Sequence, residues 1–400
     1  MISFNPLKLN RCDCFLIIWV IYYLQGVVYP EGGIISIGLL AVNLLVSMLY
    51  TVKVMLLPNN PVYFKGLNML MWLFTIYGIV YIAVNPSTIS YSIPGISVQS
   101  YNYLKAIYLS MLPIYPFYYF AKKGYLSAGR LRKWGFVFLV SAVISYFKMQ
   151  QEAFEKLLEL GSTAEEVTNN SGYLFLSCIP LLVIYRTKPF VQFAALAFVM
   201  AFIVMGMKRG AILIGTVVFV YFIAQTIKNS RGKYRFLFIV LSIIVCIGAV
   251  CFFMYQMENS DYMMRRIEDT MEGNSSHRDD LYSHFWNYFM YSATSLHFLC
   301  GRGANGTLEI YYNYAHNDWL ELAVNQGILG LLVYIFYWIS LCKTWKRTSN
   351  IEARTILVMT IFIFFAKTIF SMSYGDMTYV NTSVLGYALA NVNSSNCKKI

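Results

Sequence analysis

Residues 301–330 read GRGANGTLEIYYNYAHNDWLELAVNQGILG, a stretch that begins as a polar, glycine-rich loop and ends as the start of an apolar helix. His316 and Asn317 stand where the loop gives way to the helix. Asp318 and Glu321 fall in the first helical turn, where carboxylates complement the positive end of the helix dipole. The same end disfavours a charged histidine, so His316 should be neutral near pH 7 and able to accept a proton. The alternative is that His316 only caps a membrane helix at the interface.

The composition predicts a membrane protein. Of the 400 residues, 58% are hydrophobic and 12% are charged, whereas a soluble domain carries roughly 25% charged residues. No small-residue cleavage site follows the first apolar run, so we expect this run to remain as a helix rather than a cleaved signal peptide. Basic cytoplasmic loops explain the net charge of +12, which therefore does not indicate nucleic acid as a partner.

Apolar segments recur along the chain, and most approach the roughly 20 residues that a helix needs to cross the hydrocarbon core. The twelve predicted segments are 14–29, 33–57, 67–84, 103–121, 134–147, 171–187, 190–207, 211–227, 236–256, 316–341, 355–372 and 379–392. We therefore expect an all-α, polytopic membrane protein with about 12 transmembrane helices, forming a single integral membrane domain over residues 1–400.

Charge patterning predicts the orientation of these helices. With the N-terminus in the cytoplasm, most Lys and Arg residues fall in cytoplasmic segments, where Asp13 and Glu352 are the only acidic residues. Both termini are then cytoplasmic, and the large loop 257–315, between the ninth and tenth helices, lies outside. Within this loop, 278–299 has apolar residues at helical spacing, which predicts a helix along the membrane surface. We expect a short acidic surface helix and a turn in loop 148–170.

Two cations occupy a short link on the predicted outer side. Lys208 and Arg209 precede Gly210 between two long apolar runs, which breaks the charge pattern that the rest of the chain follows. The free N–H groups of the helix that starts at Gly210 would reinforce the Arg209 guanidinium in binding an anion such as a diphosphate. The alternative is that these cations only reach toward lipid headgroups.

Two further arginines lie in the large outer loop. Arg278 opens the predicted surface helix and either binds an anion or pairs with a neighbouring aspartate. Arg302 lies between Gly301 and Gly303, and glycines on both sides let the backbone approach a ligand closely. Several cations and one neutral base on one membrane face suit transfer onto a hydroxyl from an anionic lipid carrier.

No pattern in the chain predicts a metal site or a cofactor. His277, His284 and His297 of the large loop lack metal-ligand spacing, and the eight cysteines are too scattered to predict a disulfide framework. Lys105 and Lys367 lie within apolar segments, where an ionisable group is costly and often functional unless it reaches a helix end.

These residues resemble the O-antigen ligase/polymerase superfamily of bacterial envelope glycan enzymes. The resemblance covers about 200–335. The family's His-Asn-x-x-Leu, six residues, Gly-x-x-Gly pattern is matched by His316, Asn317, Leu320, Gly327 and Gly330. The family's Arg-Gly-Ala pair of helix hinges is matched by Arg209, Gly210 and Ala211. The family also has an Arg followed by an aromatic helix and a Gly-x-Gly, which is matched by Arg278, Trp286, Gly301 and Gly303. Where the family often has Ser before its first Arg, this chain has Lys208.

The resemblance implies a metal-independent, inverting glycosyltransferase on the periplasmic face of the bacterial inner membrane. Its donor would be an oligosaccharide on undecaprenyl diphosphate, and its acceptor a sugar hydroxyl of another glycan. His316 would be the catalytic base. Arg209 and Arg278 would also be catalytic, and the substrate-binding residues would be Arg302, Lys208 and Asn317. Besides the lipid bilayer, a flippase and a chain-length regulator would be further partners.

The acceptor stays open at this point. A polymerase, which we favour, adds to a second lipid-linked repeat unit; a ligase adds to the lipid A core; a third enzyme type glycosylates proteins. A polysaccharide or lipid transporter is the alternative from a different class. Transporters favour internal repeats and charges at mid-membrane, whereas this chain has no evident repeat and its charges cluster in the outer loops.

Overall fold

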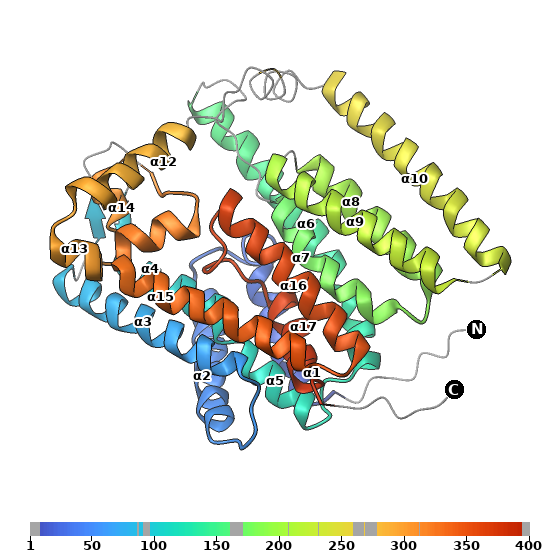
Figure 1. The fold of residues 1–400 in the computed structure, drawn as a ribbon, viewed down its shortest axis with the longest axis horizontal. Coiled ribbons are helices and arrows are strands. Elements are labelled where there is room, and N and C mark those ends of the chain that lie inside the picture. The colour runs from blue at the N-terminus through green and yellow to red at the C-terminus, as the bar shows by residue number, and fades with distance from the viewer. Residues whose placement is uncertain are drawn as a thin grey trace.

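The structure is a computed structural model that describes residues 9–85, 88–90, 97–160, 171–206, 208–230, 232–258, 268, 278–311 and 313–393. Helices dominate it (Figure 1). The first half contains α1 (Arg11–Tyr23), α2 (Ile34–Met55), α3 (Tyr63–Val84), the antiparallel strands β1 (Thr88–Ser90) and β2 (Ser97–Gln99), α4 (Asn102–Met111), α5 (Ile114–Lys122), α6 (Ala128–Leu160), α7 (Ser171–Leu182), the 3₁₀ turn η2 (Val183–Tyr185) and α8 (Pro189–Met205). The second half contains α9 (Arg209–Asn229), α10 (Gly232–Glu258), α12 (Arg278–Asn287), the π-helical turn η3 (Tyr288–Ser292), α13 (Ser295–Cys300), α14 (Thr307–Ile310), α15 (Asp318–Arg347), α16 (Ile351–Phe370) and α17 (Tyr379–Ala390).

Polar caps set where the last three long helices begin. The side chains of Asn317, Asn350 and Thr378 accept hydrogen bonds from first-turn N–H groups of α15, α16 and α17. Pro113 stands between α4 and α5, so the predicted segment 103–121 is a pair of short helices rather than one.

Six of the described helices are long and apolar enough to cross a membrane: α2, α3, α9, α10, α15 and α16. α2 buries Ser36, Asn43 and Ser47 and exposes Ile34 and Leu49, the reverse of a helix on a soluble protein. Small and polar residues facing the protein and apolar ones facing outward are typical of a helix in lipid. The chain is therefore a multi-pass, helical membrane protein. Each of the twelve predicted segments contains a helix or a helix pair, and the number of spans stays a prediction.

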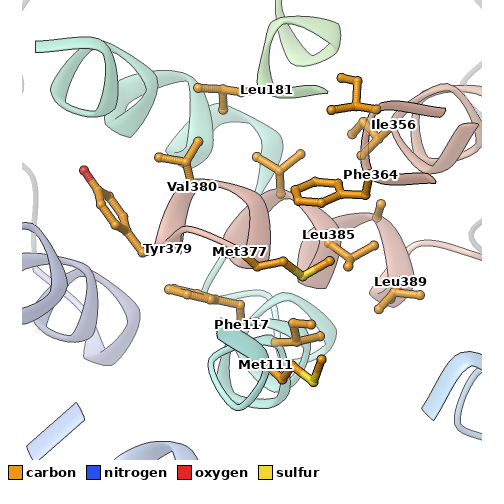
Figure 2. Packing of buried hydrophobic residues seen from close by; sticks show 14 of the residues in the cluster. Met111, Phe117, Leu181, Ile356, Phe364, Met377, Tyr379, Val380, Leu385 and Leu389 are labelled. Carbon is orange, nitrogen blue, oxygen red and sulfur yellow. The ribbon is translucent and has the colours of Figure 1, made fainter. Parts of the chain in front are cut away.

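The last helix forms the centre of the core. Figure 2 shows side chains of α17, among them Val380 and Leu385, packed between Leu181, Phe117 and Phe364 of neighbouring helices. α17 contacts α5, α7 and α16, whereas α15 lies alongside α3 (Figure 1). α10 stands at the edge and contacts only α8 and α9 closely within the described chain. The C-terminal helices thus join the N-terminal ones into one body.

Two predicted surface helices differ from the structure. Segment 278–299 is not one helix but α12, the turn η3 and α13, and its apolar residues Leu281 and Phe285 pack with Ala315 and Val324 of the protein. These two residues at helical spacing therefore face the protein, and the position of the segment along the membrane surface stays a prediction. The acidic part of loop 148–170 continues α6 without a break as far as Leu160; residues 161–170 lie outside the described chain.

Candidate active site

His316 lies immediately before the helix it was expected to open. Its backbone has a φ of +49°, a left-handed conformation that is uncommon for residues other than glycine. Asn317 then caps α15, because its side-chain oxygen accepts hydrogen bonds from the backbone N–H groups of Trp319 and Leu320, at 2.9 and 3.2 Å. The residue that caps α15 is therefore Asn317 and not His316.

Burial and two cations keep the His316 ring neutral. Burial of the side chain lowers the pKa of His316 from 6.5, and the positive charges of Arg278 and Lys208 lower it further. A lowered pKa of His316 agrees with the neutral histidine predicted from the helix dipole. Here burial is the larger cause of the lowered pKa, and the two cations add to it. A neutral imidazole retains one nitrogen that can accept a proton.

Three side chains converge on the last carbonyl groups of α16. Arg278 donates from Nη1 to the carbonyl oxygen of Phe370 at 2.7 Å. Tyr282 and Asn317 donate to the carbonyl oxygen of Ile369, at 3.2 and 3.4 Å. Carbonyl groups at a helix C-terminus lack partners within the helix, and a cation there also complements the dipole. These bonds hold the start of α12 and the start of α15 against the end of α16.

The link between α8 and α9 also lies beside the C-terminal end of α16. Gly210, in the first turn of α9, lies so close to α7 and α16 that a Cβ there would be 2.6 Å from the Tyr173 hydroxyl and 3.0 Å from Cβ of Phe370. Any larger residue would push α9 away from them. Lys208 occupies the N-cap position of α9 without a side-chain capping bond, and its charge acts on His316. In this chain the cation that acts on the candidate base from this link is Lys208, which stands where the family often has Ser.

Arg302 belongs to a different set of contacts. Its guanidinium pairs with Glu309, with Nη2 2.9 Å from a carboxylate oxygen, and Nη1 donates to the Tyr288 hydroxyl at 3.3 Å. The side chain of Arg302 thus contacts Glu309 and Tyr288, whereas the charges that act on His316 are those of Arg278 and Lys208. The structure thus brings Lys208, Arg278, His316 and Asn317 together and places Arg302 against the neighbouring loop.

Glycines at the Arg302 loop and in α15 let two backbones touch. Gly327 has φ +65° and ψ −159°, so α15 is kinked there. The kink frees the carbonyl oxygens of Val324 and Asn325, which accept hydrogen bonds from the N–H groups of Arg302 and Gly303, both at 2.9 Å. A Cβ on Gly301 would lie 2.3 Å from backbone atoms of Asn325. The Gly-x-Gly and Gly-x-x-Gly patterns therefore include a backbone latch between loop and helix, which the sequence alone did not reveal.

Two fully buried carboxylates underlie the His316 loop. Glu321 accepts hydrogen bonds from the Thr307 hydroxyl and the Ala315 N–H group, both at 2.7 Å, and from the Asn325 amide at 2.8 Å. Asp318 accepts from the Tyr334 hydroxyl at 2.5 Å and from the Ser373 N–H group at 2.8 Å. From the sequence, both residues are predicted only to complement the helix dipole. Their spacing of three on one helix face was the available signal for a shared, buried role.

Metal binding has no support among the residues that the structure describes, because no group of three or more His, Cys, Asp or Glu side chains gathers there. His277 lies outside the described chain. Positive charges of Arg278 and Lys208 act on His316, while Asp279 and Asp280 follow Arg278 and the buried Asp318 lies two residues from the histidine.

The fold is that of a multi-pass membrane protein, with a candidate site around His316 where α9, α12 and α15 begin and α16 ends. Residues 193–335 match the family model described as O-antigen ligase, and this match supports the resemblance of the chain to the O-antigen ligase/polymerase superfamily. The matched region contains every candidate residue discussed above from Lys208 to Gly330. No curated protein sequence matches the chain. Members of this family are membrane enzymes of the glycosyltransferase type that use lipid-linked glycans.

Proposed function

We propose that this protein transfers a glycan from undecaprenyl diphosphate to a sugar hydroxyl of an acceptor glycan. The observation that carries the proposal is a half-buried His316 whose pKa is lowered by desolvation and by the positive charges of Arg278 and Lys208. One site then offers a proton acceptor for the incoming hydroxyl and positive charge for the leaving diphosphate. The family match over 193–335 supports this class of reaction.

The proposed reaction is a single displacement at the anomeric carbon. The acceptor oxygen forms a bond to that carbon while a ring nitrogen of His316 takes the hydroxyl proton. The bond from the carbon to the diphosphate oxygen breaks, and its electron pair stays on the diphosphate. Arg278, Lys208 and Arg209 stabilise the added negative charge, and the anomeric configuration inverts. Because diphosphate is a good leaving group, positioning and charge stabilisation supply most of the catalysis.

Binding of the donor would also tune the base. The charges of Arg278 and Lys208 lower the pKa of His316 in the free protein. A bound diphosphate would offset those charges, so the pKa of His316 would rise when the donor is in place. His316 would then be a stronger base in the complex than in the free protein. Arg278 and Lys208 would thus both bind the diphosphate and set the pKa of His316.

We place the reaction on the periplasmic face of the inner membrane, with both termini in the cytoplasm. The excess of Lys and Arg in the predicted cytoplasmic segments supports this orientation. The acceptor we favour is a second lipid-linked repeat unit, which makes the protein a polymerase. The alternative is the lipid A core, which makes it a ligase. Analysis of the product separates the two, because a polymerase leaves the lengthened glycan on undecaprenyl diphosphate.

The test is turnover of the purified protein with an undecaprenyl-diphosphate oligosaccharide, for the wild type and for His316→Ala. Loss of a general base typically costs about 10²–10⁴ in rate, so we expect a loss of that order with donor binding retained. A loss of less than about tenfold would be smaller than the smallest loss expected for a general base. If His316→Ala keeps more than about a tenth of the wild-type turnover, His316 is structural and the mechanism is wrong.

A further inference from the structure

A cavity of about 430 Å³ lies among α1, α4, α6, α7 and the link 371–378 that follows α16. Its volume is within the roughly 300–1,000 Å³ typical of small-molecule sites. Aromatic rings line much of it, from Tyr22, Tyr23, Phe138, Tyr173 and Tyr379. In Figure 2, Tyr379 points away from the packed cluster around Phe364 and Leu385. The apolar segments of the sequence do not predict this cavity, because its walls come from five separate parts of the chain.

Tyr173 connects the cavity to the candidate active site. It lines the cavity, and its hydroxyl is the group that lies against Gly210 next to the Lys208–Arg209 link. The charge of Arg278 acts on the same hydroxyl. The Lys367 ammonium lies 4.9 Å from the centre of the Tyr173 ring and forms an ion pair with Asp376, which also lines the cavity. The cavity therefore begins where the proposed diphosphate would be held.

The lining suits sugar residues better than an isoprenoid chain. Besides the aromatic rings it presents hydroxyl and charged groups, from Ser110, Ser145, Ser177, Thr378, Lys148, Glu152 and Asp376. Rings can cover the apolar C–H faces of a sugar, while hydroxyl and charged groups bond to its hydroxyls. Several of these groups have partners in the protein, since the Ser177 hydroxyl donates to the Tyr173 carbonyl and Lys148 pairs with Glu152. Charged groups in the lining still favour a polar occupant, because an isoprenoid tail would remove their water and offer no hydrogen bond in return.

We propose that this cavity binds the sugar residues that are bonded to the diphosphate of the donor. The proposal rests on the proposed function, because it takes the diphosphate to lie beside Arg278 and Lys208. The first sugar of such a donor is bonded directly to the diphosphate, so it must occupy space that adjoins the cation site. The cavity reached past Tyr173 is such a space, and the acceptor then approaches from the side of His316.

The test fills the cavity from a position that is not part of the site. Ala106 of α4 lines the cavity and is itself exposed, so Ala106→Trp adds an indole ring without displacing a packed core residue. The matched control is Ala41→Trp, on an exposed position of α2 that does not line the cavity. A second, smaller filling variant is Ser145→Leu. Binding of the full-length protein is measured with two probes: undecaprenyl diphosphate alone, and undecaprenyl-diphosphate-linked glycan extracted from cells that produce the protein.

We expect the wild type and Ala41→Trp to bind the glycan-bearing probe more tightly than the bare diphosphate. Ala106→Trp should bind the bare diphosphate as the wild type does and lose about tenfold in affinity for the glycan-bearing probe, as for one or two lost hydrogen bonds. Ser145→Leu should lose less, in the same direction. Unchanged binding of both probes by Ala106→Trp and Ser145→Leu, or equal weakening of both, overturns the cavity assignment alone. If the wild type binds neither probe, the proposed function fails and this inference with it.

Discussion

The arginines at 278 and 302 lie in one segment of the chain, and their surroundings are opposite. Arg278 binds the end of α16 and influences the His316 ring. Arg302 is paired with Glu309 and lies over Tyr288, above the kink of α15. In the sequence the two arginines have similar surroundings, since each is a cation where a polar loop borders a helix. The difference teaches that two arginines with similar sequence surroundings can have different contacts: Arg278 acts on His316, whereas Arg302 contacts Glu309 and Tyr288.

The largest expected contrast is between Arg278→Ala and Arg302→Ala. Removing one group that stabilises developing negative charge costs about 10²–10³ in kcat, and we expect a loss of that order for Arg278→Ala. An exposed ion pair such as Arg302–Glu309 contributes about 0–1 kcal/mol, so Arg302→Ala should keep most of its turnover. The measurement is kcat and KM of both purified variants with the same lipid-linked donor.

Arg278→Lys separates charge from geometry in this contrast. Lysine keeps the positive charge and lacks the planar fork that binds a diphosphate through two hydrogen bonds. It should restore turnover only in part. Equal losses from Arg278→Ala and Arg302→Ala would contradict the division of labour between the two arginines.

The next contrast concerns the carboxylates at 321 and 309. Glu321→Gln puts an amide group where two oxygens accept bonds from Thr307, Asn325 and the N–H of Ala315, the residue before His316. An unmade bond to a buried donor costs about 1–3 kcal/mol, and we expect His316 to be misplaced and kcat to fall about tenfold to a hundredfold. Donor binding should not change, since Glu321 is a positioning residue. The matched control, Glu309→Gln, removes the exposed ion pair with Arg302 and should keep its kcat; a loss confined to donor affinity in Glu321→Gln would contradict the assignment.

Hydrophobic runs predicted the helices well because lipid-crossing segments must be long and apolar whatever they pack against. The candidate residues around His316 were also predictable, since their motif is local in sequence. The path of 278–299 was not, because the same apolar spacing serves contact with lipid and contact with protein, and here it serves protein. The latch between Gly301 and Gly327 escaped prediction for a related reason. A glycine shows that the backbone can come close to something, but not to what.

The latch predicts a difference between two glycines. Gly301 has φ +75°, and a Cβ there would meet the backbone of Asn325 at 2.3 Å. A left-handed conformation alone costs a residue with a side chain about 1–3 kcal/mol, so Gly301→Ala should clearly lower Tm. Gly38 in α2 has nothing within 4 Å of a Cβ, and Gly38→Ala should leave Tm unchanged or raise it slightly. Thermal unfolding in one detergent compares the two; equal Tm values would show that the loop does not need the latch.

The smallest expected effect is a shift between two pH profiles of the wild type, and it tests the link between the cations and the base. Only the neutral form of His316 can accept a proton, so activity should fall as pH drops through the His316 pKa. In the free protein that pKa is lowered from 6.5 by burial and by Arg278 and Lys208, and kcat/KM reports it. In the complex the donor diphosphate offsets the two charges, so the pKa seen in kcat should be higher. The acid limb of the kcat profile should therefore begin at a higher pH than that of kcat/KM. Lys208→Gln removes one cation that lowers the pKa of His316, so the acid limb of its kcat/KM profile should begin at a higher pH than that of the wild type. Identical profiles in the wild type would mean that the diphosphate does not bind beside these cations.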